Sequence, residues 1–422
     1  MLPAGQTLSY DAAPAFATPL RFFLTAPLFG VAAGAALLAA PELLDSRWTP
    51  GALAVTHLLA VGFMLSVMLG ALFQILPVVA GANIPRSAPV SAVVHAALTL
   101  GGICLAWGLA SGAPALLATA TVLLGGALAL FLVAAWIGLR STPIAQATPR
   151  DLRIALLGFG IAVALGVTLA LILAGKLALP LLTLLKLHVG WALLGGCGVL
   201  LAAASWVVVP MFQITPNYPA AMTRYWAGGT FALLVAWSGA VLAGISTLEF
   251  ALALAFAVTC ILFAVSTLRL QRQSRRAVPD STTRAFQLGM GSFMAGLACA
   301  LVAQHSDAAL WPMLAGILLL HGGFVSVIVG MLYKIVPFLA WLHLTQDVGK
   351  SPNMKKLQPD APVRRHLALH TAALALLLVA AVVGEPLLVR AAGILVVVEF
   401  AALLTNLVNV LGAYRRARAI AA

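Results

Sequence analysis

Twelve long apolar stretches constrain this 422-residue chain more than any other feature of its sequence. They run over residues 20–41, 52–78, 89–111, 114–139, 154–174, 180–212, 222–244, 247–268, 285–304, 310–338, 367–384 and 387–413. Each is long enough to cross a bilayer as a helix, which takes roughly 18–20 apolar residues. Their apolar residues are continuous and do not alternate with polar ones, which argues against membrane-spanning β-strands. The sequence therefore predicts an all-α polytopic membrane protein with twelve transmembrane helices.

The overall composition leads to the same class. Hydrophobic residues make up 63% of the chain and charged residues only 8%, whereas soluble domains carry about a quarter charged residues. Too few polar groups are present to cover a water-exposed surface, so lipid must solvate most of the chain.

The basic residues predict how the helices are oriented. All but four of the 24 lysines and arginines fall at one set of alternating connections, and the exceptions are Arg47, Lys176, Lys186 and Arg390. The positive-inside rule then places both termini in the cytoplasm, as in a bacterial inner-membrane protein. Anionic lipid headgroups beside these loops account for the net charge of +13, and no nucleic-acid partner is expected. The first twenty residues lack a basic start and contain Asp11, so we expect the first helix to remain as an uncleaved anchor.

Three of the apolar stretches share a pattern in which a histidine precedes a proline. The pairs are His57 with Pro77, His188 with Pro210, and His321 with Pro337. The eight residues ending at each proline read small-x-x-aromatic-x-(Ile/Val)-(Leu/Val)-Pro, with Gly70, Ala203 and Gly330 as the small residues and Phe73, Trp206 and Tyr333 as the aromatic ones. The three histidines are almost evenly spaced along the chain, so each repeat would hold four helices. We predict one transmembrane domain made of three repeats, residues 1–150, 151–280 and 281–422, in a pseudo-threefold arrangement.

These three histidines are the candidate metal ligands. Ionisable side chains inside spanning helices usually face the bundle interior and carry function, although a neutral histidine can simply bond between helices. Neutral imidazole binds haem iron and copper, and nearby glycines would let a flat ligand approach the backbone. His366 and His370 also lie one helical turn apart, and an i, i+4 histidine pair can bind a metal, but their position at the water-facing inner start of the eleventh stretch favours interfacial polarity.

On these residues the chain resembles subunit I of the haem–copper oxidases and, more loosely, the NnrS-type membrane proteins. The resemblance implies a low-spin haem b between His57 and His321, with His188 as a third position where copper is possible. It departs from the oxidases in that residues 222–244 contain no histidine, so reduction of dioxygen or nitric oxide is not implied. The implied function is electron transfer, sensing of nitric oxide or oxygen, or support of a respiratory complex, with other electron-transfer membrane proteins as partners.

Glu399 supports a rival hypothesis. It is the only carboxylate deep in a predicted spanning helix, and Asn406 and Asn409 follow it at intervals of seven and ten residues. Such a polar stripe can serve a proton-coupled secondary transporter that uses Glu399 and the histidines, or it can form hydrogen bonds between helices.

Overall fold

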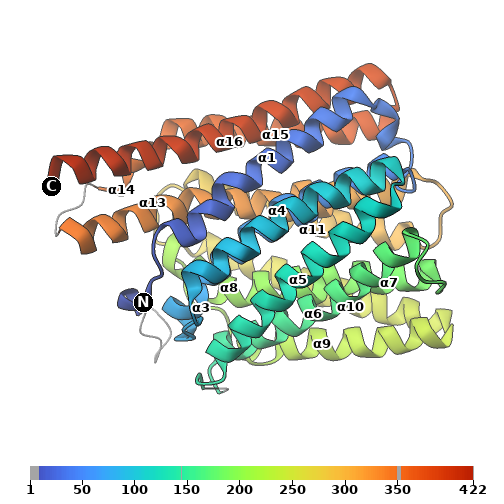
Figure 1. Cartoon of the computed structure of the whole chain (residues 1–422), viewed down its shortest axis with the longest axis horizontal. Helices are drawn as coiled ribbons and strands as arrows, with labels where there is room; N and C mark the ends of the chain where they lie inside the picture. The colour runs from blue at the N-terminus through green and yellow to red at the C-terminus, as the bar shows by residue number, and fades with distance from the viewer. Residues whose placement is uncertain (1–8, 144, 349–352, 422) are drawn as a thin grey trace. The chain divides into compact units, whose positions relative to one another are not determined.

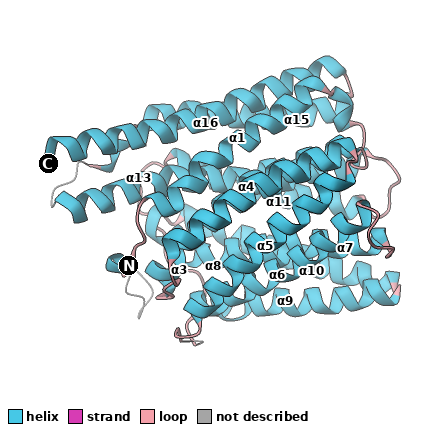
Figure 2. Ribbon diagram, viewed as in Figure 1, coloured by secondary structure: helices cyan, strands magenta, loops and turns pink. Residues whose placement is uncertain are grey.

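The computed structural model describes residues 9–143, 145–348 and 353–421, and every regular element within them is a helix (Figures 1 and 2). The first eight of the twenty residues from which an uncleaved first helix is predicted lie outside this range. Twelve helical runs in the described residues are long and apolar enough to cross a membrane. They cover Ala17–Ala39, Pro50–Ala80, Ser87–Ser111, Pro114–Leu139, Ala147–Leu173, Leu181–Gln213, Ala220–Ala243, Ser246–Arg272, Ser281–Val302, Leu310–Asp347, Asp360–Val383 and Pro386–Ile420. The predicted number of spanning helices is confirmed.

The helices group into two compact units, and the long helix that ends at Ala80 contributes to both. Unit 1 combines the described residues up to Pro14 with Ala71–Ala277, and unit 2 combines Ala15–Gly70 with Val278–Ala422. Unit 2 therefore joins the first helices of the chain to the last ones.

Unit 1 holds the middle of the chain. After the end of α3 (Ser66–Ala80) come α4 (Ser87–Ser111), α5 (Pro114–Leu139), α6 (Ala147–Leu173), α7 (Leu181–Gly190), η4 (Trp191–Gly198), α8 (Val199–Gln213), α9 (Ala220–Ala243) and α10 (Ser246–Arg272). The short turn between α4 and α5 works because Gly112 ends α4 with a φ of 66°, a left-handed conformation that glycine adopts without strain. The turn allows α4 and α5 to lie side by side (Figure 1).

Unit 2 contains α1 (Ala17–Ala39), η2 (Pro41–Leu44), α2 (Pro50–His57), η3 (Leu58–Leu65), α11 (Ser281–Val302), α12 (Leu310–Ile317), η5 (Leu318–Val325), α13 (Ser326–Val348), α14 (Met354–Leu357), α15 (Asp360–Val383) and α16 (Pro386–Ala421). The C-terminal helix α16 packs along α1 and α15 (Figure 1). On another side of the unit, α11 packs against η5 and α13.

Three spanning helices contain a π-helical segment of the same length, and the three segments occupy the same register. Leu58–Leu65, Trp191–Gly198 and Leu318–Val325 each begin and end at the same sequence distance before the proline of the repeat. The three histidines do not share this register, because His57 and His188 precede their segments and His321 lies inside η5. π-Turns are rare and often mark functional positions.

The three repeat prolines do not all lie near the end of a helix. Pro77 and Pro210 lie three residues before the ends of α3 and α8, whereas α13 continues from Pro337 to Val348. A proline removes only its own N–H donor and disturbs the preceding turn, so the helix can resume after it.

Candidate metal centre

Three buried side chains of unit 2 converge where η5, α15 and α16 meet. His321 is 2% exposed, and His370 and Glu399 are 0% exposed. One ligand atom from each residue lies within 4.8 Å of those of the other two. Two imidazoles and a carboxylate at this separation could hold a metal ion.

Glu399 joins the two histidines. Its Oε1 lies 2.6 Å from His370 Nδ1, and its Oε2 lies 3.3 Å from His321 Nε2. The two imidazole rings stack with their centroids 4.8 Å apart and their planes at 28°. Both nitrogens are thus directed toward one carboxylate, which supplies the negative charge that a cation needs in a buried site.

Two further side chains bond to these groups. Ser326 Oγ lies 2.6 Å from His370 Nε2, so the serine and the carboxylate occupy opposite nitrogens of the same ring. His366, one turn before His370 on α15, donates from Nε2 to the backbone carbonyl oxygen of Glu399 at 3.1 Å. The polar network therefore connects α13, α15 and α16 inside unit 2.

Two atoms at the centre of this network remain unsatisfied. Within the described part of the chain, His321 Nε2 and Glu399 Oε2 have no hydrogen-bond partner. They face each other at 3.3 Å without the geometry of a hydrogen bond. A buried polar group without a partner costs about 1–3 kcal/mol, and an ion bound between the two atoms would remove that penalty.

Apolar and aromatic groups surround the network. The Phe400 ring lies edge-on to the His321 ring, with 6.3 Å between their centroids. The Phe63 ring lies edge-on to Phe400, with 4.9 Å between centroids. The ring centroids of Tyr333 and His366 lie 5.4 Å apart, and the Tyr333 hydroxyl accepts a hydrogen bond from Asn406. This low-dielectric environment strengthens every electrostatic interaction inside it.

The three histidines predicted as ligands have different surroundings. His321 belongs to the convergent group, while half-buried His57 donates from Nδ1 to the carbonyl oxygen of Leu53 at 2.8 Å. In unit 1, His188 donates from Nδ1 to the carbonyl oxygen of Ala162 at 2.9 Å. Both bonds assign the ring proton of these histidines to Nδ1, because a carbonyl oxygen can only accept.

Two residues that the sequence placed at the interface are buried instead. His366 is 2% exposed and His370 0% exposed, so the prediction of interfacial polarity is wrong for both. Glu399 does bond between helices, through His370. The predicted stripe ends early, because Asn406 bonds Tyr333 but Asn409 is exposed. The deep carboxylate and the i, i+4 histidine pair were the sequence signals for this centre, but nothing in the sequence joined them to His321.

A haem iron at His321 fits this arrangement poorly. Glu399 Oε2 already lies 3.3 Å from Nε2, and the His370 ring stacks against the imidazole. A porphyrin iron bound at that nitrogen would have to displace the carboxylate. The donor set of two imidazoles and one carboxylate suits a compact ion.

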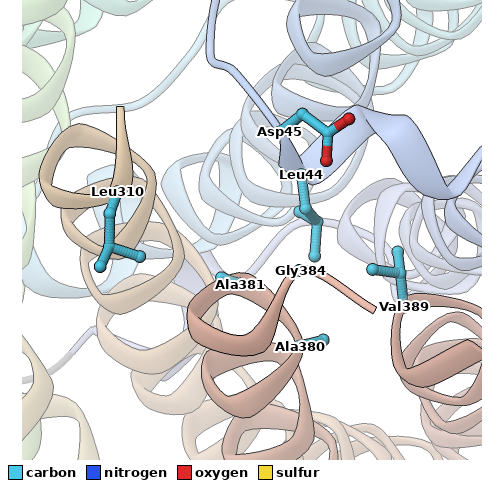
Figure 3. Close-up of a pocket in the computed structure, with 7 residues that line it drawn as sticks. All are labelled: Leu44, Asp45, Leu310, Ala380, Ala381, Gly384 and Val389. Carbon is cyan, nitrogen blue, oxygen red and sulfur yellow. The ribbon is translucent and has the colours of Figure 1, made fainter. Parts of the chain in front are cut away.

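A cavity of about 260 Å³ lies elsewhere in unit 2 and is shown in Figure 3. It is lined mainly by apolar side chains at the ends of helices, including Leu44, Leu310 and Val389, with Asp45 as its charged residue. Ala380, another lining residue, follows His370 by ten residues on α15, a rise of about 15 Å along the helix. The cavity is therefore separate from the metal centre.

The twelve apolar helices identify the chain as an integral membrane protein. No protein-family model matches it, and no curated protein matches it with significant similarity.

Proposed function

We propose that this protein is a membrane metalloprotein that binds one transition-metal ion at His321, His370 and Glu399. The observation that carries the proposal is a pair of buried atoms without a hydrogen-bond partner, His321 Nε2 and Glu399 Oε2, which face each other at 3.3 Å. A cation between them would satisfy both atoms and would explain why an ionisable residue from each of three helical elements is buried at one point.

The donor types narrow the class of metal. Imidazole suits zinc, copper, iron and nickel, and two histidines with one carboxylate are typical of non-haem Fe(II) and of catalytic zinc. Three protein ligands also leave a coordination position for a small molecule. A redox-active ion would agree with the electron-transfer or sensing role implied by the resemblance to the oxidases.

Packing in unit 2 supports the proposed internal repeat and, with it, the oxidase-like fold. A Cβ on Gly70 would lie 3.1 Å from the carbonyl oxygen of Pro19, and a Cβ on Gly330 would lie 3.1 Å from that of Thr282. The sequence separation between Pro19 and Thr282 nearly equals that between the two glycines. The first two helices and the ninth and tenth therefore make the same close contact.

A second pair of glycines repeats this relation. Gly62 and Gly322 occupy the same position relative to the proline of their repeat. Their nearest side chains are Phe29 and Ser292, which have the same separation along the chain as Pro19 and Thr282. This agreement supports a structural correspondence between the first and the third of the predicted repeats.

The metal site is tested by purifying the full chain in detergent and measuring its bound metals by mass spectrometry. We expect about one transition-metal ion per chain in the wild type and a loss of that ion in His321→Ala and His370→Ala. His95→Ala, in α4 of unit 1, is the control and should retain the ion. A metal content unaffected by both variants would refute the site.

The visible spectrum of the same preparation tests the haem expected from the resemblance. A six-coordinate low-spin haem b lost in both His57→Ala and His321→Ala would support the ligand pair predicted from the sequence. Its absence from protein produced with ample haem would leave the compact ion as the centre.

Proton-coupled transport is a second candidate, favoured by the hydrogen-bonded row Ser326–His370–Glu399. A row of this kind can hold and pass a proton. Infrared difference spectra recorded across a pH step would test it, because a carboxyl band that changes with pH and vanishes in Glu399→Gln is expected. If the spectra of wild type and Glu399→Gln are the same, Glu399 takes up no proton.

A further inference from the structure

We infer that Ser326 is a positioning residue of the metal centre, directing His370 to bind a divalent first-row transition metal through Nδ1. This inference rests on the proposed function. It adds the residue that selects the ligating nitrogen and hence the geometry in which the ion is held.

The argument begins with the two nitrogens of His370. Nδ1 lies on the side of Glu399 Oε1, at 2.6 Å, and Nε2 lies 2.6 Å from Ser326 Oγ. A ligating nitrogen must present its lone pair, so the ring proton of a neutral histidine ligand must sit on the other nitrogen. With the ion at Nδ1, the Nε2–H of His370 donates to Ser326 Oγ.

Because the site is buried, this hydrogen bond fixes the orientation of the His370 ring. Ser326 and His370 are both 0% exposed, so water is not at hand to replace the hydroxyl. Without it, the Nε2–H would be left without an acceptor, and the ring could rotate to present the other nitrogen. Outer partners of this kind typically contribute roughly 10–100-fold to metal affinity.

The π-helical segment explains how one helix supplies both a ligand and its support. His321 lies in η5, and Ser326 follows it by five residues as the first residue of α13. In a π-turn the backbone hydrogen bond runs from i to i+5 and the turn is wider, so residues five apart lie closer to the same side of the helix. In a regular α-helix, with about 3.6 residues per turn, the same two residues would point in different directions. The wider turn therefore brings His321 and Ser326 to the same group.

Ser326, His370 and Glu399 are hydrogen-bonded in the order of a serine–histidine–acid catalytic triad. Such a serine must reach a substrate carbonyl, whereas Ser326 is fully buried. Together with the unpaired atoms on Glu399 and His321, this burial favours a supporting role over a nucleophilic one.

The test uses Co²⁺ as the probe, because its visible absorption reports the type and geometry of its ligands. The full chain is purified in detergent, freed of metal with a chelator and titrated with Co²⁺. Ser326→Ala should bind about 10–100-fold more weakly than wild type, with shifted absorption bands. Ser326→Thr, which restores the hydroxyl, should recover both the affinity and the spectrum.

Ser66→Ala is the matched control. Ser66 is 2% exposed and, like Ser326, immediately follows a π-segment, at the same position relative to the repeat proline. This variant should bind Co²⁺ as the wild type does. Wild-type affinity and spectrum in Ser326→Ala would overturn the inference, as would a Ser326→Thr variant that is correctly folded but no better than Ser326→Ala. If the wild type itself binds no Co²⁺ and contains no native metal, the proposed function fails first.

Discussion

Replacing Glu399 by glutamine is the most direct perturbation of the metal centre. The substitution keeps the size of the side chain, and in the metal-free protein the amide oxygen can still accept the hydrogen bond that His370 Nδ1 makes at 2.6 Å. The change removes the negative charge and replaces the other carboxylate oxygen, Oε2, by an NH2 group, at a residue that is 0% exposed. An effect on metal binding can therefore be assigned to the charge and the second oxygen of the carboxylate and not to loss of the contact with His370.

The expected magnitude can be bounded from the general energy of an interaction with a charged group. Hydrogen bonds to charged groups contribute about 1.5–3 kcal/mol, and neutral ones about 0.5–1.5 kcal/mol. Loss of a charge-assisted interaction of about 1.5–3 kcal/mol corresponds to a Kd raised roughly 10–150-fold. This is a lower estimate, because the carboxylate would also be a direct ligand of the ion.

Titration of the metal-free protein with Co²⁺ or Zn²⁺ measures this change, and size-exclusion chromatography checks that the variant is folded. Glu399→Gln should bind at least tenfold more weakly than wild type. An affinity within about twofold of wild type, together with lost binding in His321→Ala, would refute the role of the carboxylate as a ligand.

Three further predictions concern the helices around the centre. Burial alone raises the pKa of the Asp280 carboxyl, but its ion pair with Lys334 at 2.6 Å and its hydrogen bonds at the start of α11 outweigh burial and hold the pKa below its usual range. Asp280→Asn should therefore lower thermal stability at neutral pH, and because the folded-state pKa is depressed, the difference from wild type should shrink as the pH falls below about 4. Gly330→Val should destabilise the protein by about 1–3 kcal/mol in thermal unfolding, because a Cβ at this position would lie 3.1 Å from the Cβ of Ala285. Gly291→Ala is the control and should not destabilise the protein, because the space around Gly291 is open. Reporter fusions at both termini should show a cytoplasmic location, and a periplasmic signal from either would contradict the orientation predicted from the basic residues.

The sequence alone was sufficient for the number and approximate bounds of the spanning helices. Apolar length is a local property, since each segment must satisfy its own backbone hydrogen bonds and match the bilayer regardless of its neighbours. The helix ends were less predictable: α13 continues past Pro337 to Val348, because a proline disturbs the turn before it and the helix can resume after it.

The sequence also indicated parts of the metal centre. His321 and Glu399 stood out because each is an ionisable residue deep in an apolar stretch. Their relation to each other did not stand out, since they lie far apart in the sequence and belong to different elements. His370 was assigned to the interface because it lies near the start of an apolar stretch. This position carries no information about which helices cover the side chain.

The tertiary structure decided which side chains share one point. The packing of α15 against α16 brings His370 to Glu399, and the π-turn in η5 directs His321 to the same carboxylate. A π-turn depends on hydrogen bonds from i to i+5, and side-chain periodicity in a uniformly apolar helix does not reveal where the regular pattern widens. The apolar pattern therefore determined which segments cross the membrane, while long-range packing and one irregular turn determined where a metal ion can bind.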